Sequence, residues 1–160
     1  MNFFTSMLVL HIAAGSVCLS VGLFAVSVKK KKGNHTKSGE VYHASFAVLF
    51  STAVIMALLH WEESAALFYV AIFSYSLAFI GYMARKRRWK NWISLHIRGM
   101  LGSYIGLVTA VLITNGQDIP LLNLLPDWSL WLLPTIIGSP IIFYVAERYR
   151  RLKKQNTALS

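Results

Sequence analysis

Hydrophobic residues along the chain form long uninterrupted stretches, and charged residues are confined to the short segments between them. The windows without Asp, Glu, Lys or Arg are 1–28, 41–61, 64–84, 99–117 and 128–146. A helix that crosses the hydrocarbon core of a bilayer needs about 20 consecutive apolar residues, and each window approaches or exceeds that length. A soluble domain of 160 residues has no core large enough to bury five such segments.

The sequence therefore predicts an all-α fold, a five-helix transmembrane bundle that forms a single domain over residues 1–160. The expected spans are 3–28, 42–60, 65–84, 95–115 and 129–146. Short loops rich in Lys and Arg stay on the cytoplasmic side of a membrane, and these residues cluster at 29–37, 85–98 and 148–154. The other two loops carry only acidic charges, at Glu62, Glu63, Asp118 and Asp127. We therefore expect the N-terminus outside the cell and the C-terminus in the cytoplasm.

The net charge of +10 would suggest a nucleic-acid partner in a soluble protein, but here it follows from the basic loops. Basic residues beside helix ends attract anionic lipid headgroups, each by about 1 kcal/mol. We therefore expect contacts with the lipid bilayer and its anionic headgroups, and no nucleic-acid partner.

The first apolar window has no positive charge before it and no convincing cleavage site for a secretory signal. We expect it to remain as the first helix. Within it, residues at spacings of four, three and four share one helix face: His11, Gly15, Cys18 and Gly22. We expect that face to point into the bundle.

Small residues recur on one face of the fourth helix, at Gly99, Gly102, Gly106 and Ala110. This spacing lets another backbone or a flat ligand approach closely. We expect a tight contact with a helix of the same chain or of a homodimer, and a cofactor surface is the alternative. In the fifth helix, Pro134, Gly138 and Pro140 predict a bend. The apolar segment 119–125 is too short to span and is expected to lie on the outer surface.

Histidines are the main chemical signal in the sequence. By depth, His11 and His60 fall toward the outer side, and His43 and His96 toward the inner side. Ionisable groups inside a membrane usually face a partner in the bundle. Two pairs of imidazoles would suit haem b groups that carry electrons across the bilayer. Arg98 would donate a hydrogen bond to a quinone carbonyl. The alternative for His11 is a hydrogen bond to a neighbouring Ser, Thr or carbonyl. For the helix-end histidines it is a solvated cap or a contact with lipid headgroups.

Two further sets of residues are candidate sites. The first would hold a divalent metal at the outer side, because imidazole and carboxylate suit zinc and related ions: His11, His60, Glu62 and Glu63. The second is a polar cluster at the inner face: His35, Tyr42, Arg98 and Tyr104. An arginine at that depth either finds a partner, such as Glu40, a lipid phosphate or a quinone carbonyl, or extends to the headgroups.

Three segments share a recognisable pattern: His11-x-x-x-Gly15, His35-Thr-Lys-Ser-Gly39-Glu-Val-Tyr42, and His96-Ile-Arg98-Gly-Met100 followed by Ser103-Tyr104. In these segments the chain resembles a family of small bacterial predicted multi-pass membrane proteins of unknown function. The resemblance covers the first four predicted helices and implies a multi-pass protein of a bacterial cell membrane without an assigned activity. Family members carry Arg where this chain has Thr36 and Glu40, so the resemblance does not imply an anion-binding loop.

The sequence has no Gly-rich phosphate loop, nucleophile elbow, zinc-protease helix or carboxylate within a span. This pattern argues against a membrane hydrolase and against a proton-coupled transporter that uses a buried acid. It favours a non-catalytic membrane subunit or regulator, whose histidines and Arg98 brace the bundle and whose basic loops meet lipid or a partner protein. The alternatives are a small redox protein that binds haem or quinone through its intramembrane histidines, and a metal-binding membrane protein.

Overall fold

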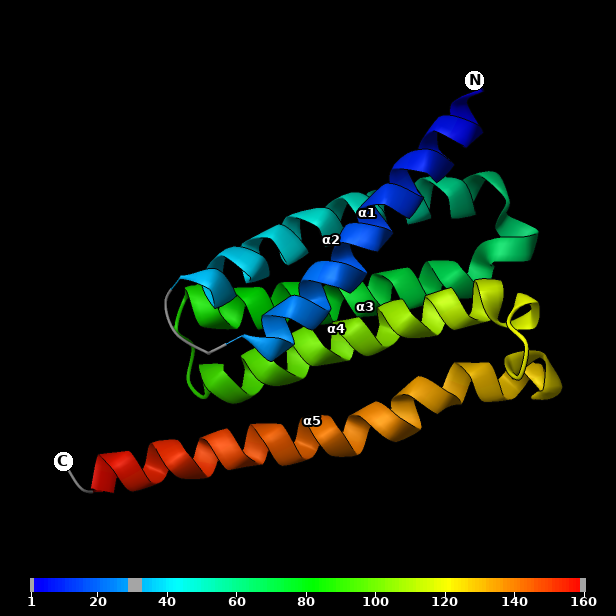
Figure 1. The fold of residues 1–160 in the computed structure, drawn as a ribbon. Helices are drawn as coiled ribbons and strands as arrows, with labels where there is room; N and C mark the ends of the chain where they lie inside the picture. Colours follow the sequence, from blue (N-terminus) through cyan, green and yellow to red (C-terminus); the bar gives the residue numbers. More distant parts are fainter. Residues whose placement is uncertain (1, 29–32, 159–160) are drawn as a thin grey trace. The chain divides into compact units, whose positions relative to one another are not determined.

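The computed structural model describes residues 2–28 and 33–158, with side chains through Leu152, and this part of the chain contains five α-helices (Figure 1). They are α1 (Phe3–Ser27), α2 (Asn34–Leu59), α3 (Trp61–Lys86), α4 (Trp92–Asn115) and α5 (Asp127–Ala158). All five are long and apolar enough to cross a membrane. The predicted all-α fold is therefore confirmed for the described residues, and the orientation of the termini stays a prediction. Residues 29–32 and the side chains of Lys153 and Lys154, which belong to the predicted basic clusters, lie outside the described part.

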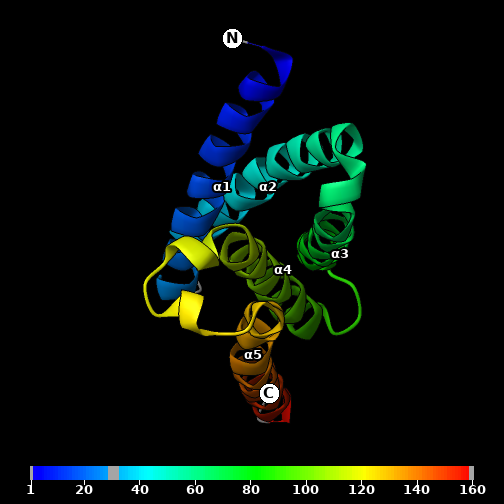
Figure 2. The same cartoon turned by 90° about the vertical axis from the view of Figure 1, so that its right-hand side faces the viewer.

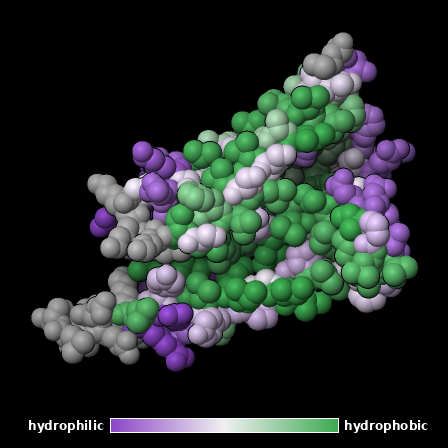
Figure 3. Space-filling model, viewed as in Figure 1, coloured by the Kyte–Doolittle hydropathy of each residue, from purple (hydrophilic) through white to green (hydrophobic). Residues whose placement is uncertain are grey.

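The surface of the helices is apolar, as expected of a membrane protein. Only 11% to 28% of the residues in the most apolar window of each helix are buried inside the structure. Figure 3 shows hydrophobic residues along the middle of the helices and hydrophilic residues near their ends. Soluble monomers rarely expose apolar surface on this scale, whereas the hydrocarbon core of a bilayer accommodates it.

Contacts divide the chain into two compact units, Met1–Tyr75 and Ser76–Ser160, and α3 contributes residues 61–75 to the first and 76–86 to the second. The prediction of a single domain is not tested by this division and stays a prediction. In the first unit α1 packs against α2, as Figures 1 and 2 both show. The predicted inward face of α1 is buried at Cys18 and Gly22, and the Cys18 thiol donates a 3.8 Å hydrogen bond to the carbonyl of Tyr42 on α2.

In the second unit, α4 packs along α5. The segment between them forms two short 3-10 turns, η1 (Gly116–Asp118) and η2 (Leu122–Leu124), and the Gln117 amide donates a hydrogen bond to the Asp127 carboxylate at the start of α5. Leu121 and Leu124 are 75% and 78% exposed, which suits an apolar segment at a membrane surface. Helix α5 continues through Pro134 and Pro140, and the bend expected there stays a prediction.

Local chemistry explains where several helices begin and end. The Asn2 side chain caps α1 by accepting a 2.9 Å hydrogen bond from the Thr5 backbone N–H. Gly33 precedes α2 with a φ of 126°, a conformation that a residue with a Cβ rarely adopts. At the other end of the chain, the Glu147 carboxylate accepts hydrogen bonds from Arg150 at 3.0 Å and from Arg151 at 3.2 Å. Such pairs one turn apart stabilise a helix where it continues beyond the apolar window.

Candidate functional site

His11 forms a hydrogen bond between two helices in the first unit. Its Nδ1 on α1 lies 3.0 Å from the Oγ1 of Thr52 on α2, and Thr52 is only 3% exposed. The Thr52 hydroxyl also donates back to its own helix, to the carbonyls of Val48 and Leu49 at 3.0 and 2.9 Å. Because that hydroxyl has one proton, its oxygen accepts the Nδ1–H of His11. The hydrogen bond expected as the alternative to a cofactor ligand is therefore present, with a threonine as the partner.

His35 and His96 each bond to a backbone carbonyl of the preceding helix. The Nδ1 of His35, in the first turn of α2, lies 3.0 Å from the carbonyl oxygen of Ala25 on α1. The Nδ1 of His96, in the second turn of α4, lies 3.0 Å from the carbonyl oxygen of Gly81 on α3. A carbonyl can only accept, so each ring donates through Nδ1–H. Both histidines thereby tie a helix start to the end of the helix before it.

The other two histidines make ring contacts in the first unit. His43 on α2 stacks on Tyr75 of α3, with ring centroids 5.9 Å apart and an interplanar angle of 11°. Phe50, two turns further along α2, stacks on the same tyrosine at 4.6 Å. His60, the residue between α2 and α3, packs against Phe4 of α1 at 4.7 Å. Aromatic pairs of this kind contribute about 0.5–1.5 kcal/mol beyond the area they bury.

Two backbones of the second unit approach each other closely beside His96. A Cβ added to Gly99 on α4 would lie 2.6 Å from the carbonyl oxygen of Leu77 and 2.7 Å from the Cα of Gly81, both on α3. A Cβ at Gly81 would lie 2.9 Å from the backbone N of Met100. The tight contact predicted for the small-residue face of α4 is therefore present at Gly99. Its partner, Gly81, was not identified from the sequence.

Several predicted sets of residues are not shown to assemble. The described residues contain no group of three or more His, Cys, Asp or Glu side chains that could hold a metal ion, so the structure does not support the predicted set of His11, His60, Glu62 and Glu63. In the predicted haem pairs, His11 contacts Thr52 and His60 contacts Phe4. His43 and His96 belong to different units, and their pairing stays a prediction.

The predicted inner-face cluster is divided in the same way. His35 and Tyr42 belong to the first unit, and Tyr42 is 2% exposed with its ring edge-on to Phe46 at 5.5 Å. Arg98 and Tyr104 belong to the second unit. There the Arg98 guanidinium lies over the Phe143 ring of α5, 6.0 Å from its centroid. The gathering of these four side chains at one site stays a prediction.

The residues shown to come together are thus histidines and their helix partners. Imidazoles that donate to a threonine oxygen and to carbonyls provide directional links between helices, at buried or half-buried positions where unpaired polar groups are costly. Comparison of the chain with protein families, with curated proteins and with solved structures finds no match. The interpretation of the site therefore depends on its geometry.

Proposed function

We propose that this chain is a non-catalytic subunit or regulator of a bacterial cell membrane, belongs to the family of small multi-pass proteins that its histidine segments resemble, and uses its histidines to brace the helices. One observation carries the proposal. Each of the five histidine side chains contacts a residue of a neighbouring helix: Thr52, Ala25, Tyr75, Phe4 and Gly81 are the partners of His11, His35, His43, His60 and His96.

These contacts have the energy expected of structural links. Interhelical hydrogen bonds within membranes contribute on average about 0.6 kcal/mol and reach about 1.7 kcal/mol. Three such bonds and two ring contacts amount to a substantial part of the stability of a small bundle, which is about 5–15 kcal/mol for ordinary domains. A bracing role therefore accounts for the histidines without an additional ligand.

Paired substitutions of His96 and His11 test this role. Asparagine places an amide N–H near the position of the imidazole Nδ1, so it keeps the donor but removes the haem-binding ring. We expect His96→Ala and His11→Ala to lower the free energy of unfolding by about 1–2 kcal/mol. His96→Asn and His11→Asn should lower it much less, because they keep a hydrogen-bond donor. The measurement is thermal unfolding of the purified full chain in mild detergent. His60→Ala removes a ring contact at an exposed position but no hydrogen bond, so it should lower stability less than the other two alanine variants do.

A reduced-minus-oxidised absorbance spectrum of the same preparations separates bracing from redox chemistry. The protein is purified from cells grown with ample haem. If the histidines brace the helices, the asparagine variants should be more stable than the alanine variants, and no variant should change a haem band. Sharp haem bands that disappear equally in His96→Asn and His96→Ala, with stability unchanged, would refute the proposal in favour of a haem protein.

A further inference from the structure

The C-terminal part of α5 carries a groove of about 400 Å³, lined by Phe143, Tyr144, Glu147, Arg148, Arg151 and Leu152. Its volume falls in the range of roughly 300–1,000 Å³ that is usual for small-ligand sites. Its lining consists of two neighbouring rows of residues one helical turn apart. One row is Tyr144, Arg148 and Leu152, and the other is Phe143, Glu147 and Arg151.

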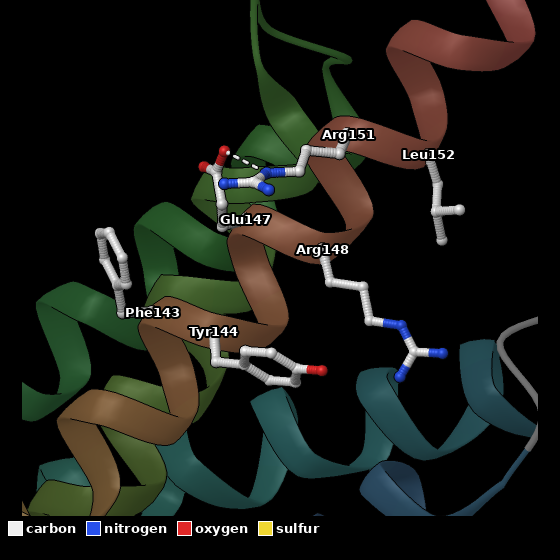
Figure 4. Close-up of a pocket in the computed structure, with 6 residues that line it drawn as sticks. All are labelled: Phe143, Tyr144, Glu147, Arg148, Arg151 and Leu152. Carbon is white, nitrogen blue, oxygen red and sulfur yellow. Dashed lines mark hydrogen bonds and ion pairs between the residues drawn. The ribbon is translucent and has the colours of Figure 1, made fainter.

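The two arginines of the groove differ in their partners. Arg151 bonds to Glu147 through Nε at 3.2 Å, and Arg150 reaches the same carboxylate oxygen at 3.0 Å. Within the described part of the chain no ion pair is found for Arg148, and no described carboxylate other than Glu147 lines the groove. In Figure 4 the Arg148 guanidinium and the Tyr144 hydroxyl extend to the same side of α5, away from the bonded pair of Arg151 and Glu147. The groove thus offers a guanidinium fork and a hydroxyl, both suited to an anionic oxygen group.

The position of the groove indicates what kind of anion it would bind. The last apolar window of the sequence ends at residue 146, and Arg148 lies about 3 Å further along the helix axis. The headgroup layer of a bilayer begins at the end of the hydrocarbon and is roughly 5–8 Å thick on each side. On the side of the last apolar window, the residues Phe143 and Tyr144 are 64% and 65% exposed. A second guanidinium, that of Arg98, lies over the Phe143 ring.

We propose that this groove is a binding site for one anionic phospholipid, with the phosphate held by Arg148 and Tyr144 and an acyl chain lying against Phe143. A soluble anion would use the arginine and the hydroxyl but not the exposed rings. A phospholipid uses both, and its phosphate lies at the depth of Arg148. A general attraction to basic loops would involve every arginine of this segment. Here we expect the affinity to depend on Arg148, because Arg150 and Arg151 are already paired with Glu147.

Native mass spectrometry of the full chain in mild detergent tests the proposal. The probes are dioleoyl phosphatidylglycerol, dioleoyl phosphatidylcholine and inorganic phosphate. We expect the wild-type protein to retain phosphatidylglycerol over phosphatidylcholine, and Arg148→Gln to reduce that retention about fivefold. Arg148→Lys keeps the charge but not the planar fork and should fall between the two. Tyr144→Phe should also reduce retention, because it removes the hydroxyl and keeps the ring.

Arg150→Gln is the matched control, since it makes the same change of charge two residues away on an arginine that does not line the groove. It should bind phosphatidylglycerol like the wild type. Equal losses in Arg148→Gln and Arg150→Gln would overturn the proposal and leave only general electrostatic attraction. Displacement of the lipid by inorganic phosphate would overturn it in favour of a soluble anion. A dimer that dissociates in Arg148→Gln would overturn it in favour of a contact between two copies of the chain. Circular dichroism checks that each variant is folded.

Discussion

Gly99→Ala is expected to destabilise the helical fold by about 2–3 kcal/mol, and Gly99→Leu to prevent the second unit from folding. The added Cβ would lie 2.6 Å from the Leu77 carbonyl oxygen and 2.7 Å from the Gly81 Cα. These are backbone atoms, which cannot rotate away as the end of a side chain can. The two helices would have to separate, which would also stretch the 3.0 Å hydrogen bond from His96 to the Gly81 carbonyl.

Two other glycines provide a graded control for this prediction. A Cβ at Gly102 would meet only the Leu77 Cδ1, at 3.1 Å, and that methyl group can move, so Gly102→Ala should cost less than Gly99→Ala. A Cβ at Gly39 on α2 would meet nothing within 4 Å. Gly39→Ala should be neutral or stabilising by up to about 1 kcal/mol, because alanine favours the helix. The order is read from thermal unfolding in mild detergent. If Gly99→Ala and Gly39→Ala unfold at the same temperature, the close approach of α3 and α4 is wrong.

The helices could be predicted from the sequence because their cause is local. A run of apolar residues long enough to cross a bilayer must satisfy its backbone hydrogen bonds within itself, and only a helix does so. The helix ends were harder to predict. Helix α2 starts at Asn34, eight residues before the predicted span. The span was placed by the absence of charged residues, but a helix can continue beyond the membrane into water. Helix α5 likewise runs past residue 146, supported by the bonds of Glu147 to Arg150 and Arg151.

The candidate site was predictable only in part. Histidine is rare enough inside a span to be noticed, and a hydrogen bond to Ser, Thr or a carbonyl was an explicit alternative for His11. Its partner could not be named, because Thr52 is one of several hydroxyls in α2 and every residue carries a carbonyl like that of Gly81. Pairing of helices decides which carbonyl lies within 3.0 Å of a ring, and pairing is a property of the tertiary structure. The structure does not support the predicted metal set, and residues at a similar predicted depth need not share a face.

The packing of α4 on α5 leads to a second prediction of large effect, centred on Ile105 and Gly138. A Cβ at Gly138 on α5 would overlap the end of the Ile105 side chain on α4, and it would lie 2.7 Å from the Ile105 Cγ1. The isoleucine therefore occupies the notch that the glycine leaves. Gly138→Ala should cost about 1–3 kcal/mol through overpacking. Ile105→Ala should cost about 1–3 kcal/mol, toward the lower end of the range for large-to-small core substitutions, because Ile105 is half-buried and the vacated notch loses its contacts.

A double variant with Gly138→Ala and Ile105→Ala shows whether the two residues are in contact or affect stability independently. In the double variant, the new methyl group at Gly138→Ala enters space that Ile105→Ala has vacated, so the combined cost should be smaller than the sum by about 1 kcal/mol or more. Ile136→Ala provides the matched control for the loss of side-chain volume, since Ile136 lies on α5 and is 66% exposed. It should change stability little, because lipid replaces its contacts. Unfolding of all four variants in one detergent measures the coupling. Additive costs would show that Ile105 and Gly138 are not in contact. A coupled pair, in contrast, fixes the register of α5 against α4. It thereby also fixes the direction in which Arg148 projects, two to three turns further along the same helix.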